Sequence, residues 1–367
     1  MVTLKEKIFY NALNLASETN FAFLSALKEN FGSFKKGWEA DNYQKISDLR
    51  RFEKDTVEKI LQRKNKINPD SEWQKLADKN IELTLLEDKN YPPLLKEIPA
   101  APLGIYQLGK CSLEKENIAI VGTRKASSYG KMVTEKIAKD LVRVNLTIVS
   151  GLAYGIDTFS HLTALEAGGE TLAILGSGID IIFPSTNKKL AKRITEHGAL
   201  ISEYPLSAPP LKHHFPERNR IISGLSLGVL IVEAPLKSGA LITARFALDQ
   251  NREVFAVPGQ IFSKNSEGTN ELIKAGAKLV NKIDDILLEL NLMDRLLTPD
   301  KNNLKLPSLN AEEKQLLEII GNSPKPLNVD ELIEKSGFDA SLVNQNLTFL
   351  ELKNLIKLDS GGYRIKF

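Results

Sequence analysis

The chain has 367 residues, of which 42% are hydrophobic and 26% are charged, and this composition is typical of globular rather than disordered proteins. The formal net charge of +3 is too small to indicate a polyanionic partner by itself, and the one cysteine, Cys111, excludes both an intramolecular disulfide and a zinc site built from several cysteines. The longest uncharged stretch, Val144–Ile156, is shorter than the ~18 residues of a bilayer span, and the N-terminus lacks the apolar segment of a signal peptide, so we expect a cytoplasmic protein without membrane contact.

Residues 1–85 are expected to form a small helical domain. Apolar residues recur at three-to-four spacing through residues 8–31, and residues 55–66 have the pattern of a further, charged helix. This region carries no strong strand pattern. The next segment, residues 86–105, contains four prolines, a density that favours extended backbone, so it is predicted to be a connector.

Residues 106–290 alternate short apolar runs with amphipathic stretches such as Tyr129–Val144 and Ala240–Asn251. The runs are Ile118–Val121, Leu146–Val149, Leu172–Leu175, Ala199–Ile201, Val229–Val232 and Val254–Val257. Apolar runs without polar alternation are typical of strands that are covered on both faces. The pattern predicts an α/β domain with a Rossmann-like, doubly wound parallel sheet.

A linker is expected over residues 291–306 and a winged-helix domain over residues 307–367. Asn310 and Asn328 are candidate N-caps of the first two helices. The expected elements are the helices Ala311–Ile320, Val329–Lys335 and Ala340–Asn354, and a hairpin of Ile356–Leu358 with Tyr363–Phe367. Three helices followed by a hairpin form the outline of a winged helix.

Small residues follow the predicted strands one after another. They lie in the segments Gly122-Thr123-Arg124, Ser150-Gly151, Gly176-Ser177-Gly178, Ser238-Gly239 and Pro258-Gly259. Ligands of open parallel sheets bind beyond the carboxyl ends of the strands, where small residues let backbone N–H groups approach a phosphate. The alternative is that these glycines only make tight turns. The loops match neither the dinucleotide fingerprint nor the Walker A pattern.

One segment combines cations with an aromatic ring: it contains Lys212, Phe215, Arg218 and Arg220. Single-stranded nucleic acids need positive charge for the backbone and an aromatic face for a base. Residues 181–252 contain ten Lys or Arg and five Asp or Glu, a local net charge of +5. A structural alternative stays open, in which Arg218 or Arg220 pairs with Glu217 or Glu233.

Other polar residues favour structural roles. The adjacent residues His213 and His214 point in different directions and have no third ligand nearby, so no metal site is expected. Asp157 and Asp180 follow strand ends and are predicted to cap helices rather than to act as acids.

The order of the motifs resembles that of the DNA-processing protein A (DprA/Smf) family of bacteria over residues 88–280. The motifs are Tyr91-Pro92, Gly122-Thr123-Arg124, Ser150–Asp157, Ser202–Pro205, Phe215–Ile222 and Pro258-Gly259. The resemblance implies a non-enzymatic protein without cofactor or metal that binds incoming single-stranded DNA during natural transformation, protects it and helps to load the recombinase RecA. It also implies a homodimer formed through the Rossmann-like domain, with a sterile-alpha-motif-like N-terminal domain and a C-terminal winged helix.

The resemblance further implies that Arg124 and Lys212 hold phosphates and that Phe215 contacts a base. The expected DNA-binding residues are Gly122, Thr123, Arg124, Ser150, Gly151, Ser177, Lys212, Phe215, Arg218, Asn219, Arg220, Ser238 and Gly239. The chain departs from the expected pattern at His213-His214, directly before the phenylalanine.

Two alternatives from other classes remain. A nucleotide N-glycosidase of the phosphoribohydrolase type has a similar sheet, but Ala244 or Arg245 stands where its glutamate is expected. A transcription regulator would use the winged helix on duplex DNA, but residues 301–367 carry no net charge. A dimer face is expected at Gly268–Ala277 and Lys278–Val280.

Overall fold

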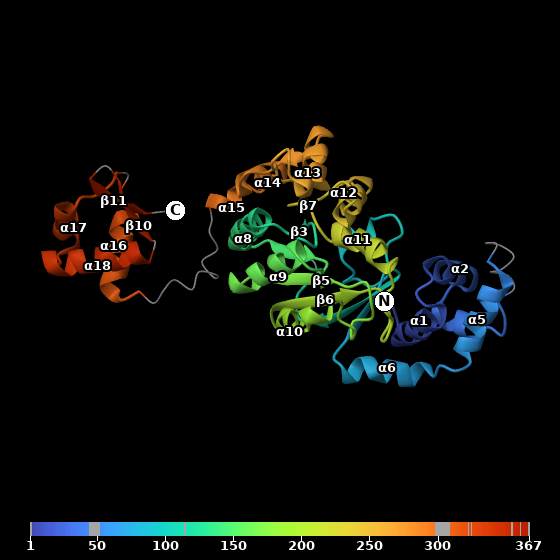
Figure 1. Ribbon diagram of the computed structural model, residues 1–367. Helices are drawn as coiled ribbons and strands as arrows, with labels where there is room; N and C mark the ends of the chain where they lie inside the picture. The colour runs from blue at the N-terminus through green and yellow to red at the C-terminus, as the bar shows by residue number, and fades with distance from the viewer. Residues whose placement is uncertain are drawn as a thin grey trace. The chain divides into compact units, whose positions relative to one another are not determined.

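A computed structural model describes residues 2–43, 52–113, 115–297, 309–321, 323, 325–353, 355–359 and 361–365. The chain divides into two compact units, residues 1–299 and 300–367 (Figure 1). Residues 298–306 of the expected linker lie outside the described residues.

The first unit begins with helices, as the sequence predicts. They are α1 (Leu4–Ser17), α2 (Phe21–Phe31), α3 (Phe34–Glu39), α5 (Lys54–Lys64) and α6 (Pro69–Asp78). Side-chain oxygens of Thr3, Asn20 and Asn68 cap α1, α2 and α6. Apolar side chains of these helices pack against Leu83 and Tyr106 of the neighbouring sheet in one continuous core.

The remainder of the first unit is one nine-stranded sheet with its helices. The strands are β1 (Glu82–Leu85), β2 (Gly104–Gly109), β3 (Asn117–Val121), β4 (Thr147–Ser150), β5 (Thr171–Ile174), β6 (Gly198–Ser202), β7 (Gly228–Ile231), β8 (Glu253–Ala256) and β9 (Lys278–Leu279). The helices are α7 (Pro93–Lys96), α8 (Ser128–Arg143), α9 (Ile156–Glu166), the 3₁₀ turn η1 (Ser185–Asn187), α10 (Lys188–His197), α11 (His214–Gly224), α12 (Gly239–Asp249), α13 (Lys264–Lys274), α14 (Ile283–Glu289) and α15 (Asp294–Leu297).

The strand order is β1-β2-β6-β5-β4-β3-β7-β8-β9, with parallel pairing from β6 to β9. β2 pairs antiparallel with both β6 and β1. Neither of these two strands is predicted from the sequence. Residues 82–85 belong to the sheet rather than to the helical domain, and the boundary expected at residue 106 falls inside β2.

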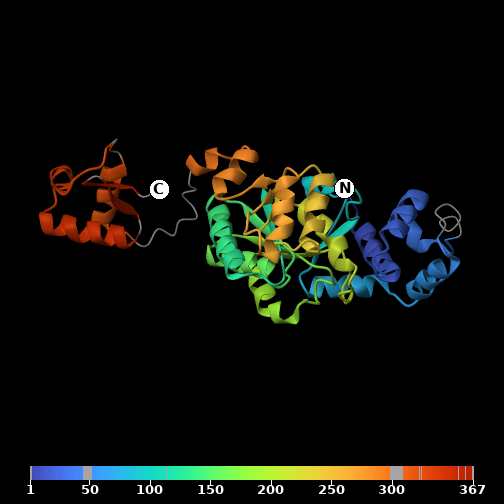
Figure 2. The same cartoon turned by 45° about the horizontal axis from the view of Figure 1, so that its top comes forward.

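Both faces of the sheet are covered, which explains the uninterrupted apolar runs. On β3, Ile118 and Ile120 pack on the side of α8, α9 and α14, whereas Ala119 and Val121 pack on the side of α7, α11 and α12. Figures 1 and 2 show α8 and α9 on one side and α11 and α12 on the other. The predicted doubly wound parallel sheet is confirmed.

The topology places a binding crevice at β3. The chain runs outward from β3 through β4, β5 and β6, and then returns to the other side of β3 for β7, β8 and β9. Ligands of such sheets bind at this reversal, between the loops that leave the two diverging strands. The loops after β3 and β7 therefore flank the expected site.

The second unit is the predicted winged helix. It contains α16 (Ala311–Gly321), α17 (Val329–Ser336), α18 (Ala340–Leu352), β10 (Ile356–Asp359) and β11 (Gly362–Ile365). Asn310 accepts a hydrogen bond from the Glu313 backbone N–H, and Asn328 accepts one from Glu331, so both predicted caps are confirmed. Asn354 and residues 366–367, at the ends of the predicted elements, lie outside the described residues.

Within the described ranges, no helix is both long enough and apolar enough to cross a bilayer.

A buried histidine makes the stability of the first unit dependent on pH. His161 is 0% exposed, and its Nδ1 lies 2.7 Å from the Thr171 hydroxyl, which itself donates to the Ile148 carbonyl. The Thr171 oxygen therefore accepts a hydrogen bond from Nδ1–H, and Nε2 has no partner among the described residues. Burial first, and Arg218 second, lower the pKa of His161 to about 3.

Because the unfolded chain protonates this histidine below about pH 6.5 while the folded chain does not, we expect stability to fall between pH 6.5 and pH 3. His161→Asn keeps a donor for Thr171 and removes the titration. Urea unfolding midpoints from pH 7.5 to pH 4 should therefore depend less on pH in the variant than in the wild type. Parallel pH profiles of the two proteins would contradict this assignment.

Candidate nucleic-acid interface

A cleft of about 830 Å³ opens at the reversal point of the sheet. The segments that line it follow β3 (residues 121–124), lead into and form α11 (residues 210–222), and follow β7 (residues 235–243). Ala153 and Phe183, from the loops after β4 and β5, and Asp157 of α9 complete the lining. Loops after five strands at one edge of the sheet therefore converge on one cavity. Of the predicted small-residue segments, Gly122-Thr123-Arg124 and Ser238-Gly239 line it, whereas Gly176-Ser177-Gly178 and Pro258-Gly259 do not.

Two exposed cations stand at this cleft. Arg124 and Lys212 both line it, and neither has a carboxylate within 4 Å among the described residues. The Arg124 guanidinium lies over the Phe215 ring, 5.7 Å from its centroid. Both cations are therefore available to an anionic ligand that also reaches an aromatic face.

A second aromatic ring, which the sequence analysis missed, extends this face. Phe183 is 44% exposed, and its ring centroid lies 5.4 Å from that of Phe215. Arg124, Tyr154 and Pro184 join the two rings around a small extension of the cleft. The sequence around Phe183 offers one signal for this role: a large aromatic residue stands in a loop that follows a strand, a kind of segment in which most side chains are polar or small.

We predict that Phe183→Ala weakens binding of single-stranded DNA by about tenfold, because stacking on an aromatic ring contributes about 1–3 kcal/mol per base. The salt dependence of binding should stay unchanged, since no charge is lost. Fluorescence anisotropy across a salt series measures both quantities. Phe183→Tyr, which keeps the ring, should bind like the wild type, and equal losses in the two variants would contradict a stacking role.

Beneath the cations, a buried charge network holds the loop after β4. The Asp157 carboxylate accepts hydrogen bonds from the backbone N–H groups of Gly151 (3.1 Å) and Ala153 (3.3 Å). Arg218 donates to the Gly151 carbonyl at 3.0 Å. A Cβ at Gly151 would lie 2.7 Å from the Arg218 Nη2, so a side chain there would displace the buried guanidinium. Asp157 thus fastens a loop and does not cap α9, whose N-cap is Gly155.

The two charges of this network shift in pKa for the same main reason. Burial raises the pKa of Asp157, and Arg218, the two backbone N–H groups and Arg124 oppose that shift. Burial lowers the pKa of Arg218 to about 10, so the guanidinium stays charged at neutral pH. Arg218 lines the cleft but is only 4% exposed, which makes it a support for the loop rather than a free phosphate ligand.

The structure separates the other predicted site residues into two groups. The cleft is lined by Gly122, Thr123, Asn219, Ser238 and Gly239. Ser150 and Ser177 do not line it: both are buried, and their hydroxyls donate to the carbonyls of Ile120 and Ile181. The expectation for these two residues is that their backbone N–H groups line the ligand site, but neither residue reaches the cleft.

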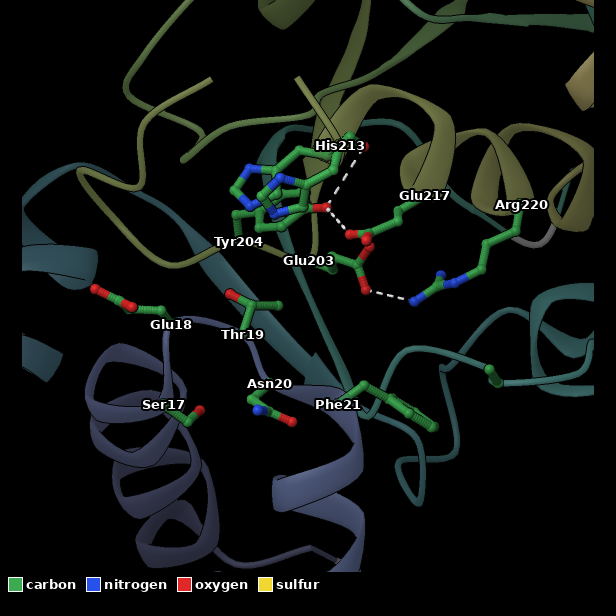
Figure 3. Close-up of a pocket in the computed structure, with 12 residues that line it drawn as sticks. Ser17, Glu18, Thr19, Asn20, Phe21, Glu203, Tyr204, His213, Glu217 and Arg220 are labelled. Carbon is green, nitrogen blue, oxygen red and sulfur yellow. Dashed lines mark hydrogen bonds and ion pairs between the residues drawn. The ribbon is translucent and has the colours of Figure 1, made fainter. Parts of the chain in front are cut away.

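Arg220 lies in a different cavity, of about 460 Å³, between α11 and the turn that joins α1 to α2 (Figure 3). Its Nη2 is 2.6 Å from the Glu203 Oε2. The structural alternative therefore holds for Arg220, with Glu203 as the partner in place of Glu217 or Glu233. Glu18, Glu203 and Glu217 give this cavity three carboxylates, so it does not suit a phosphate backbone.

Comparison with known proteins agrees with the sheet and with the second unit. A family model described as DNA recombination-mediator protein A matches residues 82–291, and one described as DprA winged helix domain matches residues 301–362. Protein Smf of Escherichia coli K12 is 40% identical over 299 residues, which cover 78% of each chain. DNA processing protein DprA of Streptococcus pneumoniae is 45% identical over 203 residues, which cover 55% of this chain and 72% of the relative.

Two solved structures share the fold. The X-ray structure of DprA from Streptococcus pneumoniae superposes with a TM-score of 0.67 at 36% identity, covering 79% of this chain and 99% of that one. A structure of DNA processing protein A from Helicobacter pylori, described for its single-stranded DNA binding mode, gives a TM-score of 0.52 at 31% identity, covering 57% and 95%. The chain belongs to the DNA recombination-mediator protein A (DprA/Smf) family.

Proposed function

We propose that this protein binds single-stranded DNA in the cleft at the reversal point of the sheet, and acts as a recombination mediator. In this role it protects incoming DNA in the cytoplasm during natural transformation and helps to load RecA onto it. One observation carries the proposal: two exposed cations, Arg124 and Lys212, which have no carboxylate within 4 Å in the described part of the chain, line the same cleft as the Phe215 ring. The relative from Helicobacter pylori with a single-stranded DNA binding mode supports the choice of ligand.

The chemistry of the cleft favours binding over catalysis. Asp157 is the only acidic residue among the described residues that line the cleft, and its carboxylate already accepts two backbone hydrogen bonds. Ala244, near the place of the glycosidase glutamate, is buried. The described residues of the cleft therefore do not supply a general acid together with a general base. Incubation with nucleoside monophosphates should release no free base, and release at enzymatic rates would favour the glycosidase instead.

The proposal is tested by gel shift with single-stranded and duplex DNA of equal length. We expect the single strand to bind more tightly, because only unpaired bases can reach the rings of Phe183 and Phe215. Loading is tested by the ATPase activity of RecA on single strands coated with single-strand binding protein, which the protein should stimulate. Preference for the duplex would contradict the binding proposal, and tight binding without stimulation would contradict the loading role alone.

We further propose that the homodimer forms through an exposed apolar patch next to the expected face. Phe262 is 94% exposed and Ile261 is 79% exposed, both directly before α13, and Leu279 is exposed on the edge strand β9. Large exposed apolar side chains are typical of interfaces, and an edge strand offers unpaired backbone groups.

We predict that Phe262→Asp converts the dimer to a monomer, because a carboxylate would have to be buried without a partner. Light scattering coupled to size-exclusion chromatography measures the mass. Leu4→Asp, at an exposed apolar residue of α1, is the matched control and should leave the dimer intact. A dimer that persists in Phe262→Asp would place the interface elsewhere.

A further inference from the structure

Helix α10 carries a row of cations that the cleft does not account for. Lys188, Lys189, Lys192 and Arg193 are all exposed, whereas Leu190, Ala191 and Ile194 pack into the core. At 100° per residue the four cations fall within one side of the helix, which also carries the exposed Glu196 and so has a net charge of +3. None of them has a carboxylate within 4 Å among the described residues, although the chain pairs many other surface lysines. We call these four residues the basic side of α10.

This arrangement is unfavourable for the helix alone. Lys188 and Lys192 are spaced i,i+4, as are Lys189 and Arg193, and like charges at that spacing repel. The first turn holds lysines and no acidic residue, although the N-terminus of a helix favours negative charge. Acidic residues occupy the first turns of α6, α14 and α17, whereas α2, α8 and α12 also begin without one; α10 differs from these three in its closely spaced cations. An anionic partner would offset both effects.

The start of α10 lies near the proposed DNA cleft. α10 begins at the carboxyl edge of the sheet, because it follows the loop after β5 and leads back to the start of β6. Phe183 lines the cleft and is five residues before Lys188, a separation of at most about 18 Å. The Asn187 side chain donates to the Leu152 carbonyl and the Thr158 hydroxyl, which ties the start of α10 to the loop after β4.

From this proximity we propose that the DNA strand leaves the cleft past Phe183 and runs along the basic side of α10, whose cations bind its phosphates. The inference rests on the proposed function and extends it: the binding path is longer than the cleft. Ser185 and Thr186, exposed between the ring and the helix, offer hydroxyl donors along the way. Because this part of the path would contact only phosphates, its affinity for DNA should not depend on the base sequence.

The test compares Lys188→Gln/Lys192→Gln with the wild type on a short oligonucleotide of about 6 nucleotides, which fills the cleft, and a long one of about 25 nucleotides. For the long strand, affinity at low salt should fall about tenfold, and the slope of log affinity against log salt should weaken by about 1.4, since each phosphate contact on single strands contributes about 0.7. Binding of the short strand should change less than about twofold.

Lys136→Gln/Lys139→Gln on α8 is the matched control, because it removes the same charge from exposed lysines that have no carboxylate within 4 Å among the described residues and do not line the cleft. The control should bind both strands like the wild type. Unchanged binding of the long strand by the α10 variant would overturn the proposal, as would equal losses for both lengths. A loss confined to duplex DNA would make α10 a duplex surface and overturn it as well.

Failure of this inference can be told apart from failure of the proposed function. If Arg124→Ala weakens binding of the short strand but the α10 variant binds the long strand normally, the cleft is right and the path over α10 is wrong. If the wild type does not bind the short strand at all, the proposed function itself fails.

Discussion

Single-stranded DNA should bind about 100-fold more weakly when Arg124 and Lys212 are both replaced by alanine. Hydrogen bonds to charged groups contribute about 1.5–3 kcal/mol each, and about 1.4 kcal/mol corresponds to a factor of ten in affinity. The loss should be equal for all sequences, because phosphate contacts read no base edge. The slope of log affinity against log salt should weaken by about 1.4, the share of two phosphates on a single strand. Filter binding across a salt series measures both changes.

The fold should survive this double change, which keeps the result interpretable. Both side chains are exposed and neither forms an ion pair with a described carboxylate, so no buried partner is left behind. Lys125→Ala is the control, since it removes a neighbouring exposed cation that does not line the cleft. If Lys125→Ala weakened binding as much as Arg124→Ala does, general positive charge rather than this cleft would hold the strand.

Arg124→Lys separates charge from shape. Lysine keeps the positive charge but loses the planar fork that forms two parallel hydrogen bonds to a phosphate and that stacks on the Phe215 ring. We expect the salt slope to stay at the wild-type value while affinity falls by about tenfold. A variant that binds like the wild type would show that charge alone acts at this position.

The central strands could be predicted from the sequence because their signal is local. Each is an apolar run that faces two covered sides, as the alternation of Ile118 and Ile120 with Ala119 and Val121 between two cores illustrates. β1 and β2 lack that signal. β1 is a short strand at the sheet edge, and β2 pairs antiparallel with β6, about 90 residues further along the chain. Polar residues and glycines interrupt the sequences of both strands (ELTL and GIYQLG), so neither forms the uninterrupted apolar run that marks the central strands.

The residue types of the site could be predicted from the sequence, but the direction in which each side chain points could not. The sequence indicated cations around Phe215, yet Arg218 and Arg220 lie on different sides of α11, one at the cleft and one beside Glu203. The two arginines can be separated by helical spacing once the helix is known to begin at His214. Positions 215, 218 and 219 then lie on one side of the helix, and position 220 lies on another. No spacing rule predicts the position of Phe183, because only the packing of the loop after β5 brings its ring next to Phe215.

Asp157→Ala should destabilise the first unit by about 3–5 kcal/mol, because the buried Arg218 would lose the nearby carboxylate that offsets its charge. Arg218 would stay charged and buried, with Arg124 as a nearby like charge, and the backbone N–H groups of Gly151 and Ala153 would lose their acceptor. Thermal unfolding should therefore begin about 10 °C lower. DNA binding should also weaken below the unfolding temperature, since the loop that supports the cleft is released.

Two further variants identify the source of that loss. Asp157→Asn keeps an oxygen acceptor for the loop and removes only the charge, so it should destabilise less than Asp157→Ala. Adding Arg218→Met to Asp157→Asn removes the buried cation as well, and the double variant should recover part of the lost stability because no buried charge remains. If Arg218→Met instead lowered the stability of Asp157→Asn further, packing of the guanidinium and its bond to Gly151 would outweigh the charge.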